Sequence, residues 1–263
     1  MKRSIQALIM METGAVIVAM AIFGPSVRAN ATPVAHTVAP VVKLTGSAAL
    51  TTVHGGLTTA AKFHVHATFS TDTPGAPLFT IQQAVIFFPD HAGTNGRLFP
   101  SCGARQIERL HGDVGRCPEG SQIGSGTLKA RALQLGITAA GRVTMFNSRH
   151  GKSITFNIQT AHPALINRSI DAPITQLHGK YGEKLTLVVP HSLQEIISGS
   201  FVGIRDFDVT IGGAVRRRGV DYSFLKARTC PRRAMHGVFD FENWATGQMA
   251  TTTADAKVRC RVR

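Results

Sequence analysis

Short strand-forming segments, separated by turn residues, fill most of this chain and restrict it to a β fold more strongly than any other feature does. Residues 61–71, AKFHVHATFST, alternate between apolar and polar side chains, which is the period of a strand with one buried face. Further segments are rich in strand formers: PLFTIQQAVIFFP, GTLKARALQL, GRVTMFNS, KSITFNIQT, KLTLVVP, SFVGIRDFDVTIGG, HGVFDFENW and ATTTADAKVRCRV. No long segment has a helical period, so the spacing favours a sandwich or barrel.

These segments predict an all-β protein, an antiparallel β-sandwich of about nine to twelve strands. We expect two short helices beside it, one with Ser101 as N-cap that runs through CGARQIERL, the other at His191–Ser198. Residues 32–47 contain two prolines and no sustained period, which predicts an extended linker or a loosely attached edge segment before a β-sandwich domain at residues 48–263. The pattern leaves open a division into two β-subdomains that meet near Pro190.

Residues 1–31 have the three parts of a secretory signal peptide. Lys2 and Arg3 supply positive charge, the apolar segment GAVIVAMAIF follows, and the small residues of ANA (29–31) fit a signal peptidase site. The uncharged stretch after Glu12 is shorter than the roughly 20 residues that a membrane-spanning helix needs. The sequence therefore predicts cleavage after Ala31, a secreted protein without a transmembrane span, and leaves attachment to the cell surface open.

Four cysteines in an exported protein are expected to form two disulfides: Cys102, Cys117, Cys230 and Cys260. Three pairings exist on paper, and the short separations along the chain favour Cys102 with Cys117 and Cys230 with Cys260. The C-x2-C spacing of zinc sites and of thioredoxin-like redox pairs is absent. The glycines of GSQIGSGT (120–127) have neither the P-loop nor the dinucleotide-binding spacing, so this region is interpreted as a covalent link between structural elements.

The same region carries a resemblance to a protein family. LFPSC and CPEGSQIGSGT, followed by Cys230-Pro231, a VFDF strand and a terminal Cys260, resemble a group of uncharacterised secreted proteins from high-GC actinobacteria. That group shares an N-terminal signal, a C…CP.GS.(V/I)G.G core and a C-terminal CP…C hairpin. This chain departs from the pattern after the second CP, where RRAMHGVF stands in place of the usual Trp. The resemblance implies a secreted β-rich domain and brings no known activity.

His64 and His66 are the best candidate metal ligands because they share one face of a predicted strand. Two imidazoles at this spacing could bind zinc or copper if a third ligand came from a neighbouring strand. His54, Asp90 and His91 are the nearest such residues in the sequence, and nothing indicates that they converge. The sequence favours a solvated polar face and predicts no metal and no other cofactor.

Catalytic motifs are missing from the sequence. It contains neither the G-x-S-x-G nucleophile motif nor the H-E-x-x-H zinc motif. Asp206 and Asp208 share one face of a predicted strand and are expected in solvent, while Phe207, Val209 and Ile211 fill the core. No catalytic residue is assigned, and the sequence predicts a protein that is not an enzyme.

Basic residues are the one kind of side chain that clusters, and they give the chain a formal net charge of +14, or +12 once residues 1–31 are removed. One cluster is Arg216, Arg217 and Arg218; the other is an outward row in the last strand, Lys257, Arg259, Arg261 and Arg263, with Val258, Cys260 and Val262 expected to point inward. A charge of this size favours anionic partners and opposes self-association, which predicts a monomer. One Trp and two Tyr offer little surface on which nucleic acid bases could stack.

The sequence thus predicts a secreted, non-enzymatic β-sandwich protein that binds an anionic polymer or a lipid surface of the cell envelope and does not bind nucleic acid. Two alternatives stay open. One is a purely structural secreted domain whose charge confers solubility and protects an edge strand. The other is a metal-dependent or hydrolytic enzyme that uses His64 and His66.

Overall fold

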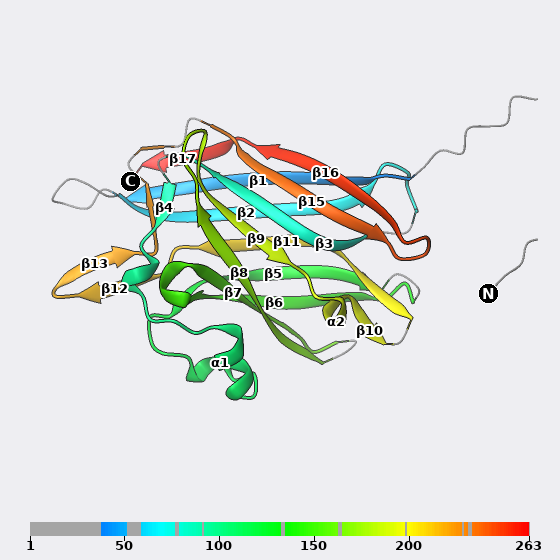
Figure 1. The fold of residues 1–263 in the computed structure, drawn as a ribbon, viewed down its shortest axis with the longest axis horizontal. Helices are drawn as coiled ribbons and strands as arrows, with labels where there is room; N and C mark the ends of the chain where they lie inside the picture. The colour runs from blue at the N-terminus through cyan, green and yellow to red at the C-terminus, as the bar shows by residue number, and fades with distance from the viewer. Residues whose placement is uncertain are drawn as a thin grey trace, which may run out of the picture. The chain divides into compact units, whose positions relative to one another are not determined.

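β-Strands make up most of the computed structural model, whose fold is drawn in Figure 1. It describes residues 38–51, 59–76, 79–90, 92–132, 135–162, 165–197, 199–227, 229–230 and 233–262. The expected signal peptide and residues 32–37 of the expected linker lie outside the described residues. Within the ranges given, no helix is long and apolar enough to cross a membrane.

A single hydrogen-bonded path of twelve strands folds over into two facing layers. The first layer runs in the order β17 (Val258–Val262), β1 (Pro40–Thr51), β2 (Thr59–Thr71), β11 (Ser200–Ile211), β5 (Gln122–Ala132), β6 (Thr138–Ser148), β7 (Ser153–Thr160) and β8 (Ile166–Gln176). The second runs from β8 through β9 (Tyr181–Val188), β3 (Thr80–Pro89) and β15 (Met235–Asn243) to β16 (Gln248–Ala256). Neighbours are antiparallel except β1 and β17, which are parallel. The predicted all-β class is confirmed.

Short elements complete the fold around this path. They are β4 (Ala92–Thr94), β10 (Glu195–Ile197), β14 (Leu225–Ala227), the hairpin of β12 (Ala214–Arg217) and β13 (Val220–Ser223), the α-helices α1 (Ala104–Arg109) and α2 (His191–Gln194), and the 3-10 helices η1 (Gly96–Leu98), η2 (Val114–Arg116) and η3 (Arg149–Gly151). β14 pairs with β2 and β4, and β10 pairs with β11.

Two chain segments pass from one layer to the other and form the corners of the sandwich. In β8, Pro173 is the last residue opposite β7, and Ile174 pairs with Leu185 of β9 instead. Proline cannot donate to a β-ladder, so it is compatible with the point where the strand leaves its first partner. At the other corner only Lys257 separates β16 from β17, so strands at opposite ends of the path are consecutive in sequence. Strands that switch layers are an established way to close a sandwich.

Apolar side chains from both layers fill the space between them. Phe69 of β2 contacts Phe239 and Phe241 of β15 edge to face, with ring centroids 5.7 and 6.3 Å apart. Phe63, Ala67 and Phe69 are buried, which confirms the inward face predicted for residues 61–71. The core of the fold is therefore built by the alternation that the sequence shows.

Both predicted disulfides are present. Cys102–Cys117 joins the two ends of the segment that contains α1, and its sulfurs pack beside Ile107 and Phe146. Cys230–Cys260 joins the chain after β14 to the last strand, β17. Because β1 is the one strand that pairs with β17 among the described residues, this bond fixes the edge of the first layer.

The two helices differ from their predicted bounds. The N-cap of α1 is Gly103 and not Ser101, because Cys102 N–H donates to Asn147 O and Gly103 is still extended. The second helix is a single turn that ends at Gln194. Glu195 turns away from it to pair with Phe201 of β11, so the helix predicted at His191–Ser198 is correct only in its first half. Ser198 lies outside the described residues.

The first strand begins inside the segment expected to be a linker. Residues 40–47 form most of β1, and Val42 and Leu44 are buried because they belong to the core cluster that also contains Phe69 and Phe239. Two prolines had suggested an extended linker, and Pro40 occupies the first residue of the strand, where the missing N–H is tolerated. The residues on both sides of Pro190 belong to one compact unit, Thr37–Arg263.

Candidate ligand cavity between the two layers

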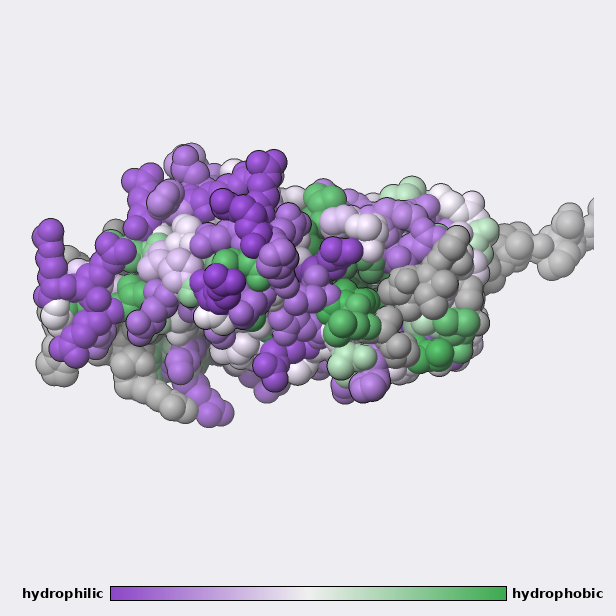
Figure 2. Space-filling model, turned by 90° about the horizontal axis from the view of Figure 1, so that it is seen from below, coloured by the Kyte–Doolittle hydropathy of each residue, from purple (hydrophilic) through white to green (hydrophobic). Residues whose placement is uncertain are grey.

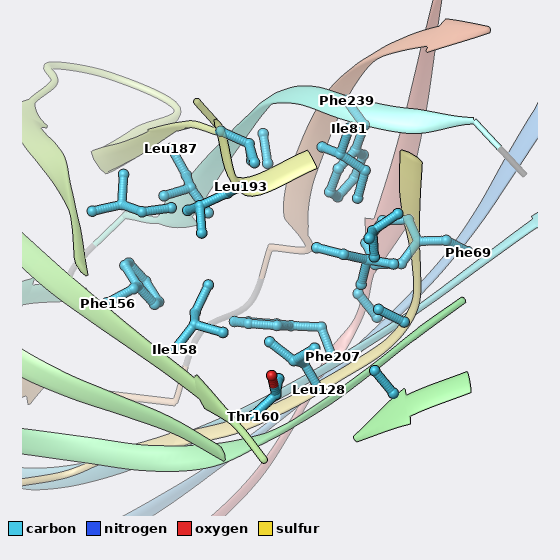
Figure 3. Close-up of a pocket in the computed structure, with 18 of the residues that line it drawn as sticks. Phe69, Ile81, Leu128, Phe156, Ile158, Thr160, Leu187, Leu193, Phe207 and Phe239 are labelled. Carbon is cyan, nitrogen blue, oxygen red and sulfur yellow. The ribbon is translucent and has the colours of Figure 1, made fainter. Parts of the chain in front are cut away.

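A cavity of about 160 Å³ lies between the two layers of the sandwich. Figure 3 shows side chains from both layers pointing into it, including Phe69, Phe156, Leu187, Phe207 and Phe239. Thr160 is the only polar residue among the described residues that line it. Protein interiors are packed closely and contain few voids larger than a water molecule, so a cavity of this size is an unusual feature of the core.

Alanines at inward positions leave this space unfilled. Ala67 on β2, Ala84 on β3, Ala130 and Ala132 on β5 and Ala139 on β6 all line the cavity. A larger aliphatic side chain at these positions would extend into the space between the layers. Since the surrounding residues are aliphatic or aromatic, the cavity has almost nothing to which water could hydrogen-bond. Apolar cavities of this kind stay dry and accept apolar ligands.

The lining of the cavity reaches the surface at the turn between β5 and β6. Ile137 lines the cavity and is also 40 % exposed, while Leu135 in the same turn is 52 % exposed. Leu165 lies in the β7–β8 turn and is 86 % exposed. It directly precedes Ile166, which lines the cavity. Both turns lie toward the right-hand side of Figure 1, and Figure 2 shows apolar side chains gathered toward that end. We call Leu135, Ile137 and Leu165 the apolar rim.

The predicted metal candidates lie elsewhere, on the outer surface of the first layer. His64 Nε2 is 2.7 Å from Asp208 Oδ1, and His66 Nε2 is 2.9 Å from Asp206 Oδ2. β2 and β11 are paired so that each histidine reaches the aspartate diagonally across the ladder. These are two polar cross-strand pairs on a half-exposed face, with Val209 and Ile211 buried on the inner side as predicted.

No third ligand joins these pairs among the residues that the structure describes. Within that part of the chain, no three His, Cys, Asp or Glu side chains are grouped so that they could hold a metal ion. Of the further ligands considered from the sequence, His54 and His91 lie outside the described residues. The strand pairing that joins His64 to Asp208 could not be predicted, because the two residues are 144 positions apart.

The two basic clusters belong to separate elements. Arg216 and Arg217 end strand β12, and Arg218 with Gly219 forms the tight turn to β13, both with positive φ (49° and 77°). Arg216 Nε lies 3.9 Å from Asp221 Oδ1, between two side chains that are each 74 % exposed. The three arginines therefore form the tip of a hairpin, which Figure 1 draws at the left-hand end, and do not form a flat face.

The predicted row on the last strand is present in part. Lys257, which directly precedes β17, and Arg259 and Arg261 on β17 are exposed, and no described carboxylate forms an ion pair with them. Arg263 lies outside the described residues. Val258 is buried and Cys260 is half-buried, but Val262 is 65 % exposed, so the prediction that it points into the core is wrong. The strand runs past the edge of the core at its last residues.

Comparison with known proteins adds no relative: no protein-family model, curated protein or solved structure matches the chain. The resemblance to secreted actinobacterial proteins therefore stays a prediction. The cavity between the layers was not predicted from the sequence. The available signal was the run of alanines at inward positions of the predicted strands, such as Ala130 and Ala132 in GTLKARALQL.

Proposed function

We propose that this protein is an exported, non-enzymatic binding module that holds an apolar chain or ring in the cavity between its two layers. The observation that carries the proposal is the cavity of about 160 Å³ with an almost wholly apolar lining. A cavity of about 150 Å³ lined by Leu, Ile and Phe is large enough to bind benzene in another protein. The ligand class is therefore a hydrocarbon chain or a small aromatic group.

The apolar rim supports a lipid surface of the cell envelope as the source of this ligand. Leu135, Ile137 and Leu165 keep large apolar side chains in solvent next to the point where the cavity lining reaches the surface. Apolar side chains at such a tip gain free energy when they enter the boundary of a bilayer. The two disulfides indicate an oxidising compartment, which supports export.

The chemistry of the lining supports binding and not catalysis. A nucleophile with an adjacent base, or a pair of acid and base groups, is what a reaction in the cavity would require. The described lining offers a single hydroxyl, from Thr160, among aliphatic and aromatic residues. Such a lining recognises its ligand by shape and hydrophobicity.

Binding of straight-chain alcohols from butanol to octanol tests this proposal. Burial of each additional methylene contributes about 0.8 kcal/mol, so the association constant should rise about fourfold per carbon until the cavity is full. Ala139→Leu extends a larger side chain from β6 into the cavity and should weaken binding of the longer alcohols about tenfold or more. Isothermal titration calorimetry gives both values.

Ala140→Leu is the matched control, because Ala140 is the next residue of β6 and is exposed on the opposite face. It adds the same side chain to the same strand without entering the cavity. We expect unchanged affinity for this variant. Affinity that does not depend on chain length, or equal losses in the two variants, would contradict the proposed site.

A further inference from the structure

A second concave site lies at the end of the sandwich opposite the apolar rim. It is a cleft of about 860 Å³ between β4, η1, η3, β14 and the corner where β8 passes to β9. β4 and β14 lie toward the left-hand end of Figure 1, where Figure 2 shows mainly hydrophilic side chains. This volume is within the range of small-molecule sites, about 300–1,000 Å³.

The walls of the cleft are fixed by buried hydrogen bonds and close backbone packing. Asn147 is buried, and its Nδ2 donates to the carbonyl oxygens of Gly96, Phe99 and Pro100, each at 3.0 Å. Gly96 packs so closely on η3 that an added Cβ would lie 2.2 Å from Gly151 Cα. The cleft is therefore preformed, as a binding site that loses little entropy on binding should be.

Strained backbone borders the same cleft. Arg149 and His150 have φ of 48° and 55°, a left-handed conformation that is uncommon for residues other than glycine. His150 N–H donates to Ser101 Oγ at 3.1 Å, which helps to hold the strained turn. Strain of this kind costs free energy and is concentrated at functional sites, so it is an independent pointer to a role for this cleft.

A buried carboxyl group, Glu183, lies at the floor of the cleft. Glu183 is 5 % exposed. Its Oε1 accepts hydrogen bonds from Thr94 N–H at 3.1 Å, from Thr94 Oγ1 at 3.4 Å and from Gln176 Nε2. Burial raises the pKa of Glu183, while the hydrogen bonds from Gln176 and Thr94 and the charge of Lys226 act in the opposite direction. The carboxyl group is thus held in a fixed position beside a cation.

Cations outnumber this one carboxyl group around the cleft. Arg97 of η1, Lys152 after η3 and Lys226 of β14 line it, together with His150. No described carboxylate lies within ion-pair distance of Arg97, Lys152 or Lys226. Arg97 and Lys152 have no carboxylate partner among the described residues, and Lys226 shares Glu183 with the cleft, so the three cations leave a net positive charge that favours a multiply charged anion.

We propose that this cleft binds the phosphate group of a small ligand or lipid headgroup through Arg97, Lys152 and Lys226. The guanidinium group of Arg97 suits the paired oxygens of a phosphate, and the two ammonium groups add charge. Glu183 tunes the site, because its carboxylate repels the anion when it is ionised and does not when it is protonated. The site is independent of the apolar cavity and of the function proposed for it.

Titration with inorganic phosphate at pH 7, followed by amide chemical shifts in NMR spectra, tests the site. We expect shifts in η1, η3 and β14, and about tenfold weaker binding in the triple variant Arg97→Gln, Lys152→Gln, Lys226→Gln. The control variant Lys43→Gln, Lys129→Gln, Arg142→Gln removes the same charge from exposed positions on β1, β5 and β6. Equal loss in both variants, or no saturable shift in the native protein, would overturn the proposal.

Titration with sulfate tests the role of Glu183, because the charge of sulfate does not change over the pH range of the experiment. Binding should tighten as the pH falls through the pKa of Glu183, and Glu183→Gln should bind more tightly at neutral pH with a weaker pH dependence. His150 also lines the cleft, and it remains in Glu183→Gln. An unchanged pH profile in that variant would refute the role of Glu183 and leave the three cations to the first test.

Vesicles distinguish the two sources of the phosphate group. Flotation with phosphatidylcholine vesicles that contain phosphatidic acid should recover native protein, but not the triple variant, if a lipid headgroup is the ligand. Phosphate binding without vesicle binding assigns the cleft to a soluble phosphate ester. Vesicle binding that survives in the triple variant assigns lipid contact to another surface, and then the NMR titration alone decides the proposal.

Discussion

Single residues at the cleft show how a buried polar group depends on distant partners. Glu183 is the third residue of β9 and lies opposite Phe88 of β3 and Gln176 of β8 in the sheet. Its carboxyl group accepts hydrogen bonds from Gln176 and from Thr94 of β4. In the sequence it is one of a few scattered acids and carries no motif. Its burial follows from the corner at Pro173, which brings the end of β8 beside β9. The burial of Glu183 could not be predicted, because no local sequence pattern indicates that corner.

Glu183 should make stability depend on pH. Because burial raises the pKa of Glu183 from its ordinary value of 4.5, the folded state holds the proton more tightly than the unfolded state does. Its contribution to the free energy of unfolding is therefore greatest below pH 4.5 and is lost as the pH rises to the folded-state pKa. Glu183→Gln should remove this loss. Urea unfolding of both proteins from pH 4 to 8 measures the difference, and parallel pH profiles would contradict the assignment.

Strands and helices could be predicted where a local sequence pattern specifies them, and less well where contacts with distant residues do so. The strands of 61–71 and 141–148 follow from alternation and strand formers, and both are present in β2 and β6. His191–Ser198 has the composition of a helix, but Phe201 stacks on Trp244 with ring centroids 5.9 Å apart and holds the β10–β11 hairpin in place. That contact joins residues from β11 and the β15–β16 turn, so a pattern read along the chain does not report it.

The last strand carries the prediction about anionic partners. We consider Lys257, which directly precedes β17, with Arg259 and Arg261 on β17. If they bind an anionic envelope polymer, reversal of all three to Glu should abolish binding at low salt and leave the fold intact, since the three side chains are exposed. Reversal of Lys43, Lys62 and Lys129, which are exposed on other strands, changes the net charge equally. Pulldown with a purified anionic polymer at increasing salt measures this. Equal losses of polymer binding in the two variants would show that net charge alone causes binding. Salt screens such charge over about 8 Å at physiological ionic strength.

At the scale of the whole described unit, the two ends of the sandwich differ in chemistry. One end carries the apolar rim beside the cavity, and the other carries the cleft with Arg97, Lys152 and Lys226. The sequence predicted the all-β class and both disulfides because alternation, turn residues and cysteine spacing are local signals. It did not predict the cavity, since inward alanines leave a void only when the facing layer fails to fill it. It did not predict the cleft either, because its residues come from five separate segments.

The central claim, that the space between the layers takes an apolar ligand, is tested most directly by methyl NMR spectra recorded during titration with benzene. We expect saturable shifts of the methyl groups of Ile158, Leu187 and Leu193, which line the cavity. These shifts should be lost in Ala139→Leu and retained in Ala140→Leu. Shifts confined to the exposed Leu165 and Val188, or no saturable shift at any lining methyl group, would contradict it.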